Sequence, residues 1–500
     1  MKLSQSYWFF ISIFPTVALG GIQTALQATG GVIKGCLELQ RLLPSQTFFA
    51  DSPEYQTQQS HYWTSQQATD IHPRCRVTPY STDDLRSIVK VVGRHQATFA
   101  TKSGGHSTVS GASNIDDGIT VDLAGLNSTE LSVDDSSAWV GIGNTWFSVY
   151  RDPTLTSAGL SVTGARAGTV GVGGFLLGGG FSWHSGRNGW ACDTVLDFEV
   201  VLANGSVVSA NENDNPDLFW ALKGGGSNFG IVTKVKIPVF KQDSMYMATT
   251  SYEGNDLPDV LVAMEDFTAE AEDPDAGLFM TIACDAKWGM CYNVMMFVNT
   301  ASNTSSSTFE PFEKIPSFEN GSEIMDMGDL SKMLSDQPGT KFRKEKFTLT
   351  FRNHRSVPLM LYLASRIHHY VHDPAYLRGA RVIAITFQPL TSRHISSSGN
   401  AFGLDAEKEP LILFSAEVHW ESSTRDQHFH DEFQSLESLF RKEAESSGLL
   451  HPFVYLNYAA SWQKPFESYG DRNLKRLKDV RGRFDPDGVF TKLQPGSLHL

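Results

Sequence analysis

The chain has 500 residues, with 41 Lys and Arg against 55 Asp and Glu, and its formal net charge is −14. A chain of this length is too long for one ordinary hydrophobic core, so we expect two or more domains. The acidic balance excludes a protein attracted to nucleic acid, and an apolar fraction near the globular norm excludes wholesale disorder. Glycine is unevenly distributed: 23 of the 43 glycines lie between Gly104 and Gly230.

The first 20 residues have the pattern of a secretory signal peptide. Lys2 supplies a positive start, an apolar run extends from Tyr7 to Leu19, and small residues permit cleavage after Gly20. The alternative is a buried N-terminal helix. No later stretch reaches about 18 apolar residues, the length of a membrane span. We therefore expect a secreted protein without membrane contact after removal of residues 1–20, followed by an N-terminal segment over 21–70.

Five cysteines and four Asn-x-Ser/Thr sequons also favour the secretory pathway. An oxidising compartment would allow Cys36 to pair with Cys75 and Cys284 with Cys291, which leaves Cys192 as a buried thiol. Cytosolic residence with free thiols is the alternative. The cysteine spacings match no zinc pattern, so we expect no metal site. The sequons are at Asn127, Asn204, Asn303 and Asn320.

Helix and strand patterns alternate from about residue 76. Thr82 is expected to cap a helix with Asp83 and Asp84 in its first turn. Asn204-Gly205 predicts a tight hairpin turn, and Asn215-Pro216 is typical of a helix start. The strands expected here are 98–102, 119–123, 138–143, 195–202, 206–209 and 231–240, with short helices at 145–151 and 217–223.

From about residue 243 the pattern changes to long alternating strands and amphipathic helices. The expected strands are 278–284, 292–297, 381–388 and 411–420, and the expected helices are 361–372 and 424–447. The Ser- and Thr-rich stretch 301–317 is typical of an exposed loop. The chain is therefore predicted to be α+β, with a glycine-rich first domain and a second domain of sheet and helices.

Three glycine clusters are candidates for binding an anion. They are Lys102–Ser107, Thr169–Gly180 and Gly224–Gly230. Glycines allow positive φ and close backbone approach, so such turns can bind a pyrophosphate through their N–H groups. The dinucleotide fingerprint does not fit Gly171-x-Gly173, because the third glycine and the strand–turn–helix context are missing. The alternative is that the glycines only make turns and bulges in a twisted sheet.

Five segments together resemble one family: Ser103–His106, Thr169–Gly180, Gly186–Asp193, Gly224–Thr233 and Tyr455–Phe490. They are similar to the FAD-linked oxidases of the vanillyl-alcohol-oxidase superfamily, in its berberine-bridge-enzyme-like and fungal oligosaccharide-oxidase branch. The resemblance covers roughly residues 60 to 500 in the same order. It implies a PCMH-type FAD-binding domain of two subdomains over 71–242. It also implies a substrate domain with an antiparallel sheet covered by helices over 243–450, and a berberine-bridge-like segment over 451–500 that returns to the FAD domain.

The resemblance also implies that FAD is bonded covalently through its 8α carbon to a ring nitrogen of His106. Many relatives add a second bond from a cysteine, and Ala167 occupies that position here, so we expect a single link. Val170 occupies a position associated with oxygen access, which favours an oxidase. The residues expected to bind the cofactor are Lys102, Ser103, Gly104, Gly105, His106, Ser107, Thr169, Val170, Gly173, Gly174, Gly178, Ile231, Asn457 and Tyr458.

Two residues are the candidates for catalysis. By resemblance, Tyr455 lies above the flavin as the base or its partner, while Asn457 and Tyr458 help to hold the cofactor. A tyrosine needs a cationic or hydrogen-bonded neighbour to act as a base at neutral pH. Alternation along 411–420 places Glu417 on one side with Ser415 and His419, so Glu417 is a second candidate base or substrate clamp. The alternatives are a strand of packed aromatic residues around Tyr455 and a solvated face around Glu417.

These observations predict an FAD-linked oxidase that moves a hydride from a small organic substrate to FAD and reduces O₂ to H₂O₂. The reaction would belong to secondary-metabolite tailoring: oxidation, desaturation or oxidative cyclisation. A secreted carbohydrate oxidase is the first alternative. A non-redox protein, either a flavin-scaffolded cyclase or a binding glycoprotein, is the second. We expect a small molecule and O₂ as partners, no nucleic acid, and a monomer.

Overall fold

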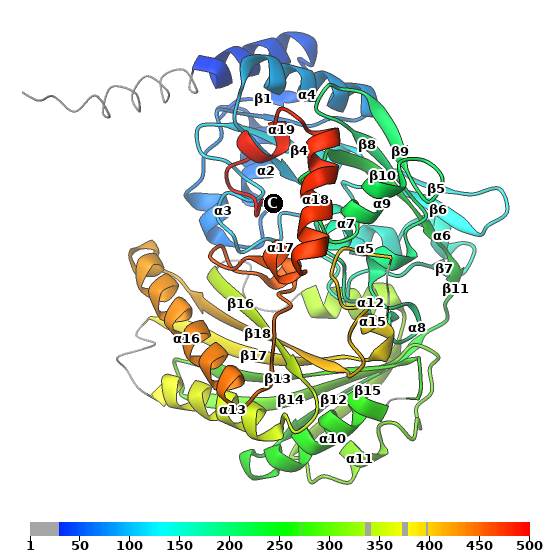
Figure 1. The fold of residues 1–500 in the computed structure, drawn as a ribbon, viewed down its shortest axis with the longest axis vertical. Coiled ribbons are helices and arrows are strands. Elements are labelled where there is room, and N and C mark those ends of the chain that lie inside the picture. Colours follow the sequence, from blue (N-terminus) through cyan, green and yellow to red (C-terminus); the bar gives the residue numbers. More distant parts are fainter. Residues whose placement is uncertain (1–29, 271, 336–341, 373–378, 397–398) are drawn as a thin grey trace, which may run out of the picture.

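The computed structural model describes residues 30–270, 272–335, 342–372, 379–396 and 399–500. The predicted signal peptide lies outside these residues. Two lobes are visible in Figure 1: an upper lobe that contains the first half of the chain and its red C-terminal end, and a lower lobe built on one large sheet. The expected α+β class is confirmed.

The first sheet of the upper lobe has four strands in the order β1-β2-β4-β3. Its strands are β1 (Thr47–Phe48), β2 (Cys75–Val77), β3 (Phe99–Lys102) and β4 (Ile119–Asp122). Helix α4 (Thr82–His95) packs its apolar face into the hydrophobic core of the upper lobe, which these strands share. The helix cap is one residue earlier than expected, because the hydroxyl of Ser81, not that of Thr82, accepts from the Asp84 amide. The Asp84 carboxylate in turn accepts from the Ser81 amide, which completes a capping box.

The second sheet of the upper lobe has five antiparallel strands in the order β5-β6-β10-β8-β9. The predicted Asn204-Gly205 turn is confirmed, because it joins the paired strands β8 and β9. The strands are β5 (Thr129–Leu131), β6 (Ser137–Gly141), β8 (Asp197–Val201), β9 (Val207–Ala210) and β10 (Ile231–Pro238). A two-stranded pair, β7 (Leu160–Ser161) and β11 (Phe240–Lys241), lies beside it. The short helices of this lobe include α2 (Pro53–Ser60), α3 (Ser65–Thr69), α5 (Trp146–Tyr150), α7 (Val172–Leu177), α8 (Ser185–Asn188) and α9 (Pro216–Leu222).

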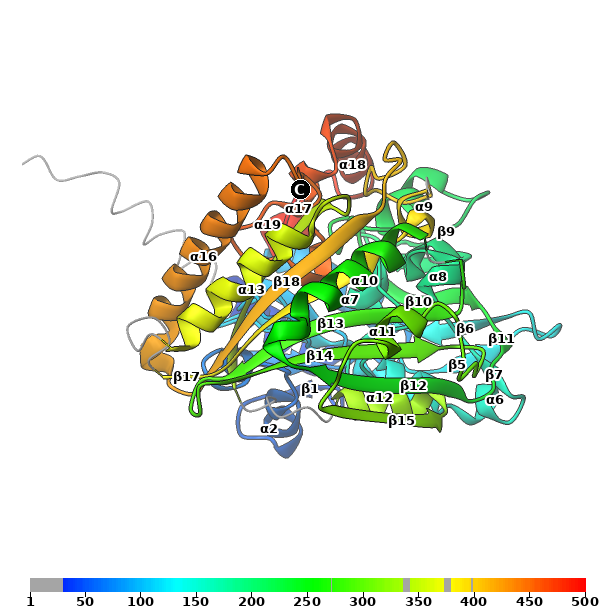
Figure 2. The ribbon, with the colours of Figure 1, turned by 90° about the horizontal axis from the view of Figure 1, so that it is seen from below.

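The lower lobe is an eight-stranded antiparallel sheet in the order β15-β12-β14-β13-β17-β18-β16-β19. Its long helices α10 (Leu257–Glu270), α13 (Val357–His372) and α16 (Asp426–Ser446) lie across one face in Figure 2 and enclose the second core. The strands are β12 (Met245–Tyr252), β13 (Ala276–Asp285), β14 (Met290–Asn299), β15 (Glu319–Met325), β16 (Arg343–Arg352), β17 (Ala380–Leu390), β18 (Leu411–Trp420) and β19 (Leu450–His451). The stretch 301–317, expected to be an exposed loop, is exposed only in part. It contains the short helix α11 (Glu310–Glu313), and its Phe309 and Phe312 side chains are buried.

The C-terminal segment returns to the upper lobe, where its red helices lie in Figure 1. These helices are α17 (Pro465–Ser468), α18 (Asp471–Phe484) and α19 (Val489–Lys492). Arg476 and Arg483 of α18 pair with Asp217 of α9 at 2.9 and 2.7 Å. The Tyr469 hydroxyl donates to the Gly224 carbonyl at 3.1 Å. These contacts fix the last 50 residues against the glycine-rich half of the chain.

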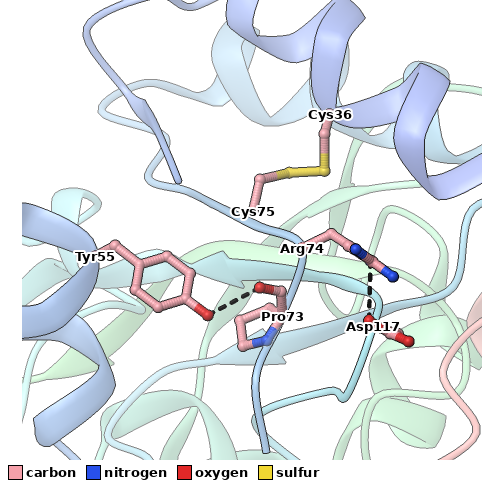
Figure 3. Close-up of a disulfide and its surroundings, with 6 residues drawn as sticks. All are labelled: Cys36, Tyr55, Pro73, Arg74, Cys75 and Asp117. Carbon is pink, nitrogen blue, oxygen red and sulfur yellow. Dashed lines mark hydrogen bonds and ion pairs between the residues drawn. A yellow bond between two sulfur atoms is a disulfide. The ribbon is translucent and has the colours of Figure 1, made fainter. Parts of the chain in front are cut away.

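Both predicted disulfides are present. Figure 3 shows Cys36, on the helix over residues 30–42, bonded to Cys75 at the start of β2. Beside it, the Tyr55 hydroxyl donates to the Pro73 carbonyl at 2.8 Å. Cys284 and Cys291 close the β13–β14 hairpin, and Cys192 is a buried free thiol. The two bonds agree with an extracellular or secretory-pathway protein. No helix within the described ranges is long and apolar enough to cross a membrane.

Candidate active site

A cavity of about 460 Å³ brings most of the predicted site residues together. Its walls come from the glycine-rich turns of the upper lobe, from β16 and β18 of the large sheet, and from the C-terminal segment. The predicted residues that line it are Ser103, Gly104, Gly105, His106, Ser107, Val170, Gly173, Gly174, Gly178, Ile231, Glu417, Tyr455, Asn457 and Tyr458.

The first two glycine clusters touch each other directly. A methyl group on Gly104 would lie 2.3 Å from the amide nitrogen of Gly171, and one on Gly171 would lie 2.1 Å from the amide nitrogen of Gly104. The Ser103 hydroxyl donates to the Ile142 carbonyl at 2.8 Å and accepts from the Gly173 amide at 3.2 Å. The glycines are therefore required for the contact between two turns, in addition to leaving backbone open to the cavity.

Two predicted cofactor-binding residues are not among the described residues that line the cavity. Lys102 is buried, and its ammonium lies 3.0 Å from the Asp122 carboxylate, opposite it in the parallel β3–β4 pair. The Lys102 side chain thus forms an ion pair inside the first sheet, and its assignment as a cofactor-binding residue stays a prediction. The Thr169 hydroxyl lies 3.3 Å from Nε2 of His106, and its assignment as a cofactor-binding residue stays a prediction.

His106 lies in a stack of side chains from three parts of the chain. The indole of Trp63 stacks on the imidazole with ring centres 4.2 Å apart, and the Lys344 ammonium lies 3.4 Å from the centre of the Trp63 indole. Burial, with the charges of Lys344 and Lys346, lowers the pKa of His106 to about 3. The imidazole is therefore neutral across the physiological range. Trp63 and Lys344 belong to no motif in the sequence, so only the folded chain shows them.

The Tyr455 hydroxyl is occupied by two donors. It accepts from the Gly180 amide at 3.0 Å and from the Asn457 side-chain amide at 3.1 Å. The side chain is 1% exposed, and burial raises the pKa of the Tyr455 phenol. These contacts connect the C-terminal segment to the turn after α7, and the raised pKa keeps the Tyr455 phenol protonated at neutral pH.

The Tyr458 hydroxyl has the opposite surroundings. It accepts from the Arg166 guanidinium at 3.0 Å and lies 3.4 Å from the Gln388 side-chain oxygen, while the Lys346 ammonium is 3.9 Å from the ring centre. Burial would raise the pKa of Tyr458, but the positive charges of Arg166 and Lys346 outweigh it, and the pKa is lowered. Tyr458 is thus the more acidic tyrosine of the predicted Tyr-x-Asn-Tyr motif.

Glu417 lines the cavity from β18 as an ionised, paired carboxylate. It is hydrogen-bonded to His419, two residues along the same face, and lies 3.6 Å from the Lys346 ammonium. Burial would raise the pKa of Glu417, but the charge of His419 and then that of Lys346 hold it below its usual range. The predicted shared face of these residues is confirmed. A carboxylate hydrogen-bonded to His419 and paired with Lys346 is a weak base, and its role as a base or substrate clamp stays a prediction.

Comparison with known proteins agrees with this site. A family model described as "FAD binding domain" matches residues 73–211, and one described as "Berberine and berberine like" matches residues 454–495. The FAD-dependent monooxygenase tpcD of Cochliobolus heterostrophus is 34% identical over 87% of this chain and 86% of its own length. The chain belongs to the berberine-bridge-enzyme-like FAD-dependent oxidoreductases. The predicted resemblance is confirmed.

Further relatives of this FAD-dependent oxidoreductase are fungal proteins and solved oxidases. The bifunctional solanapyrone synthase of Alternaria solani is 29% identical over 94% of this chain and 90% of its own. A chitooligosaccharide oxidase shares the fold with a TM-score of 0.76 and 18% identity, covering 94% of this chain and 99% of its own. The glucooligosaccharide oxidase of Acremonium strictum, described with 6-S-cysteinyl, 8α-N1-histidyl FAD, has a TM-score of 0.73 and 19% identity, with 91% and 97% covered. The matched FAD-binding family model includes His106 and Gly171, and the matched berberine-like family model includes Tyr455–Tyr458.

Proposed function

We propose that this oxidoreductase is an oxidase that removes a hydride and a proton from a small organic substrate. The observation that carries the proposal is one cavity that holds a neutral histidine, the two touching glycine turns and a tyrosine flanked by two cations. When bound, FAD would accept the hydride, and its two electrons together with two protons would reduce O₂ to H₂O₂. The chain's own groups would orient the substrate and accept its proton.

His106 is the proposed attachment residue. Its pKa of about 3 keeps a lone pair on the imidazole, which a bond to the 8α carbon requires. Nε2 faces the Thr169 hydroxyl at 3.3 Å, so we assign the bond to Nδ1, the nitrogen without that neighbour. Ala167 lines the cavity where many relatives have cysteine, and the buried thiol of Cys192 does not line it. A single covalent link is the result.

Tyr458 is the proposed proton acceptor, which revises the predicted role of Tyr455. A substrate O–H or N–H would transfer its proton to the Tyr458 oxygen as the adjacent C–H bond breaks. Arg166 and Lys346 stabilise the phenolate that such a base requires. Tyr455 instead positions Asn457 and the turn at Gly180.

The mature protein is proposed to be a secreted, monomeric glycoprotein that acts in secondary-metabolite tailoring. The two disulfides support secretion, and the sequon asparagines Asn127, Asn204, Asn303 and Asn320 are all exposed. The name of the solanapyrone synthase relative supports tailoring chemistry.

The test is a comparison of Tyr458→Phe with Tyr455→Phe. A panel of alcohols, amines and phenols is screened for anaerobic bleaching of the flavin absorbance, and the rate is then measured for the best substrate. We expect Tyr458→Phe to slow bleaching by about 10²–10⁴-fold at unchanged flavin content. Tyr455→Phe should instead lower stability or flavin content. Equal rates in wild type and Tyr458→Phe would refute the assignment. One H₂O₂ per O₂ supports an oxidase, and oxygen incorporated into the product would make the enzyme a monooxygenase.

A further inference from the structure

The imidazole of His106 has contacts on two sides that fix its orientation. The Trp63 indole lies nearly parallel to it, with 14° between the ring planes and 4.2 Å between the ring centres. The Thr169 hydroxyl lies 3.3 Å from Nε2 at the edge of the ring. The indole defines the plane of the imidazole, and the hydroxyl defines which nitrogen lies beside Thr169. Together they leave the imidazole little freedom to rotate.

The residues around Trp63 also hold the backbone on both sides of the histidine. The Trp63 amide donates to the carbonyl of Gly105, the residue before the histidine, at 3.1 Å. The Gln67 side chain donates to the carbonyl of Ser107, the residue after it, at 2.6 Å. Residues 63–67, which we call the bracing segment, therefore fix the turn itself as well as the ring that it carries.

The bracing segment is bonded in turn to the start of β16 in the large sheet. The Ser65 amide donates to the Phe342 carbonyl at 3.0 Å. The Gln66 side chain donates to the Lys344 carbonyl at 2.6 Å and accepts from the Lys344 amide at 3.2 Å. The Lys344 ammonium lies 3.4 Å from the centre of the indole, which is a close cation–π contact. The orientation of the indole thus depends on both lobes.

Trp63 differs from a tryptophan of the hydrophobic core. It lines the cavity and is partly exposed, whereas Trp146 is fully buried. Neither Trp63 nor Lys344 falls within the family-model matches over 73–211 and 454–495. Core packing alone does not account for an indole that stacks on a histidine at the cavity wall and contacts a buried ammonium on a strand of the other lobe.

We propose that Trp63 and Lys344 are positioning residues for the covalent attachment of FAD. Trp63 holds the imidazole of His106 in the orientation that reacts with the 8α carbon, and Lys344 holds the indole in place. This inference rests on the proposed function, which assigns the attachment to His106. It adds a role for residues that contact the histidine without forming the bond.

The attachment step forms a bond between an imidazole nitrogen and the 8α carbon, and it breaks one C–H bond of the 8α methyl group. Burial and the charges of Lys344 and Lys346 lower the pKa of His106, so the imidazole has the lone pair that the bond needs. The two electrons of the broken C–H bond pass into the flavin ring, followed by the methyl proton and the imidazole proton. O₂ then accepts both electrons and both protons as H₂O₂.

The experiment measures how much of the bound flavin is covalent in purified full-length protein. Total flavin per chain is measured by absorbance, and acid precipitation then separates covalent flavin in the pellet from released flavin in the supernatant. We expect the released fraction to be at least about tenfold larger in Trp63→Ala than in wild type, because misplacing a reacting group by about 1 Å slows a positioned reaction about 10²-fold. Total flavin should stay near the wild-type value, since the glycine turns still line the cavity.

Conservative variants separate positioning from a general structural role. Trp63→Phe keeps an aromatic face and should keep most of the covalent flavin. Lys344→Met should raise the released fraction by about two- to tenfold, the effect of a cation–π contact, and Lys344→Arg should restore the wild-type value. If Trp63→Ala is not secreted, Trp63→Phe and Lys344→Met decide by the same fraction.

A second tryptophan–lysine pair supplies the matched control. The Lys234 ammonium lies 4.9 Å from the centre of the Trp139 indole, and neither residue is among the described residues that line the cavity. Trp139→Ala and Lys234→Met should therefore keep the wild-type released fraction. A wild-type released fraction in Trp63→Ala, or a fraction in Trp63→Phe as large as that in Trp63→Ala, would overturn the proposal. Parallel loss of total and covalent flavin in Trp63→Ala and Trp63→Phe would assign the indole to cofactor binding or to the fold, and would overturn it as well.

The wild-type sample separates this inference from the proposed function. If all flavin of the wild type is released by acid, the covalent link itself is contradicted. If the wild-type flavin stays in the pellet and the Trp63 variants match it, only the positioning role of Trp63 and Lys344 is contradicted.

Discussion

An alanine at Gly104 should push apart the two turns that meet in the cavity. The added methyl carbon would lie 2.3 Å from the Gly171 amide nitrogen and 2.7 Å from its Cα atom. Carbon atoms in ordinary contact are about 3.5–4.0 Å apart, so the turns must separate by about 1 Å. Both sides of the clash are backbone, and no side chain can rotate away. We expect a loss of about 1–3 kcal/mol in the free energy of unfolding and a loss of bound FAD.

Two other glycines serve as matched controls. At Gly93, in α4, and Gly174, in α7, an added methyl group would meet no atom within 4 Å apart from the adjoining backbone of its own helix. Gly93→Ala should stabilise its helix by about 1 kcal/mol and leave the flavin content unchanged. Gly174 lines the cavity, so Gly174→Ala should fold normally and bind less FAD. The three variants thus separate a fold requirement from a cofactor requirement.

The assay is the ratio of flavin to protein absorbance together with the midpoint of thermal unfolding. Gly104→Ala should lower both the flavin ratio and the unfolding midpoint. Gly174→Ala should lower only the flavin ratio, and Gly93→Ala should lower neither. The reasoning is refuted if Gly104→Ala matches Gly93→Ala in both, because the turns would then tolerate a side chain. Wild-type flavin content in Gly174→Ala would show that FAD lies elsewhere.

Two further predictions concern buried charges. Lys102→Met leaves Asp122 buried without its partner, so urea unfolding should show a loss of about 3–5 kcal/mol in the free energy of unfolding, while the folded fraction keeps its flavin. A stable variant without flavin would instead support the predicted cofactor-binding role of Lys102. Burial raises the pKa of Glu345 from 4.5 to about 7, so between these values the folded protein binds more protons than the unfolded one. This stabilising contribution, about 3 kcal/mol, is present below pH 4.5 and lost as pH rises towards 7. Unfolding at several pH values should show a flatter profile for Glu345→Gln, and parallel profiles would contradict the shifted pKa.

Much of the fold could be predicted because local patterns agreed with the tertiary structure. Alternation over 411–420 gave the bounds of β18 (Leu411–Trp420), and Asn204-Gly205 marked a real hairpin. Strand β16 (Arg343–Arg352) was missed, since its Arg343, Lys344 and Lys346 hide the alternation. Those cations are accommodated by ion pairs and ring contacts with residues distant in sequence, which no local pattern reports.

The candidate active site was also predictable only in part from the sequence. His106 and the glycines could be found because each cluster is contiguous in the sequence. The roles of Tyr455 and Tyr458 could not be assigned, because they depend on the Gly180 amide for one and on Arg166 and Lys346 for the other. Only two residues separate the two tyrosines in the sequence, but the groups around them come from both lobes.

The central claim, covalent FAD on His106, is tested most directly by acid precipitation of purified wild type and His106→Ala. We predict a yellow wild-type pellet in which mass spectrometry finds one FAD on the peptide that contains His106. The His106→Ala pellet should be colourless, with any flavin in the supernatant. A colourless wild-type pellet, or flavin on the His106→Ala pellet, would contradict the account.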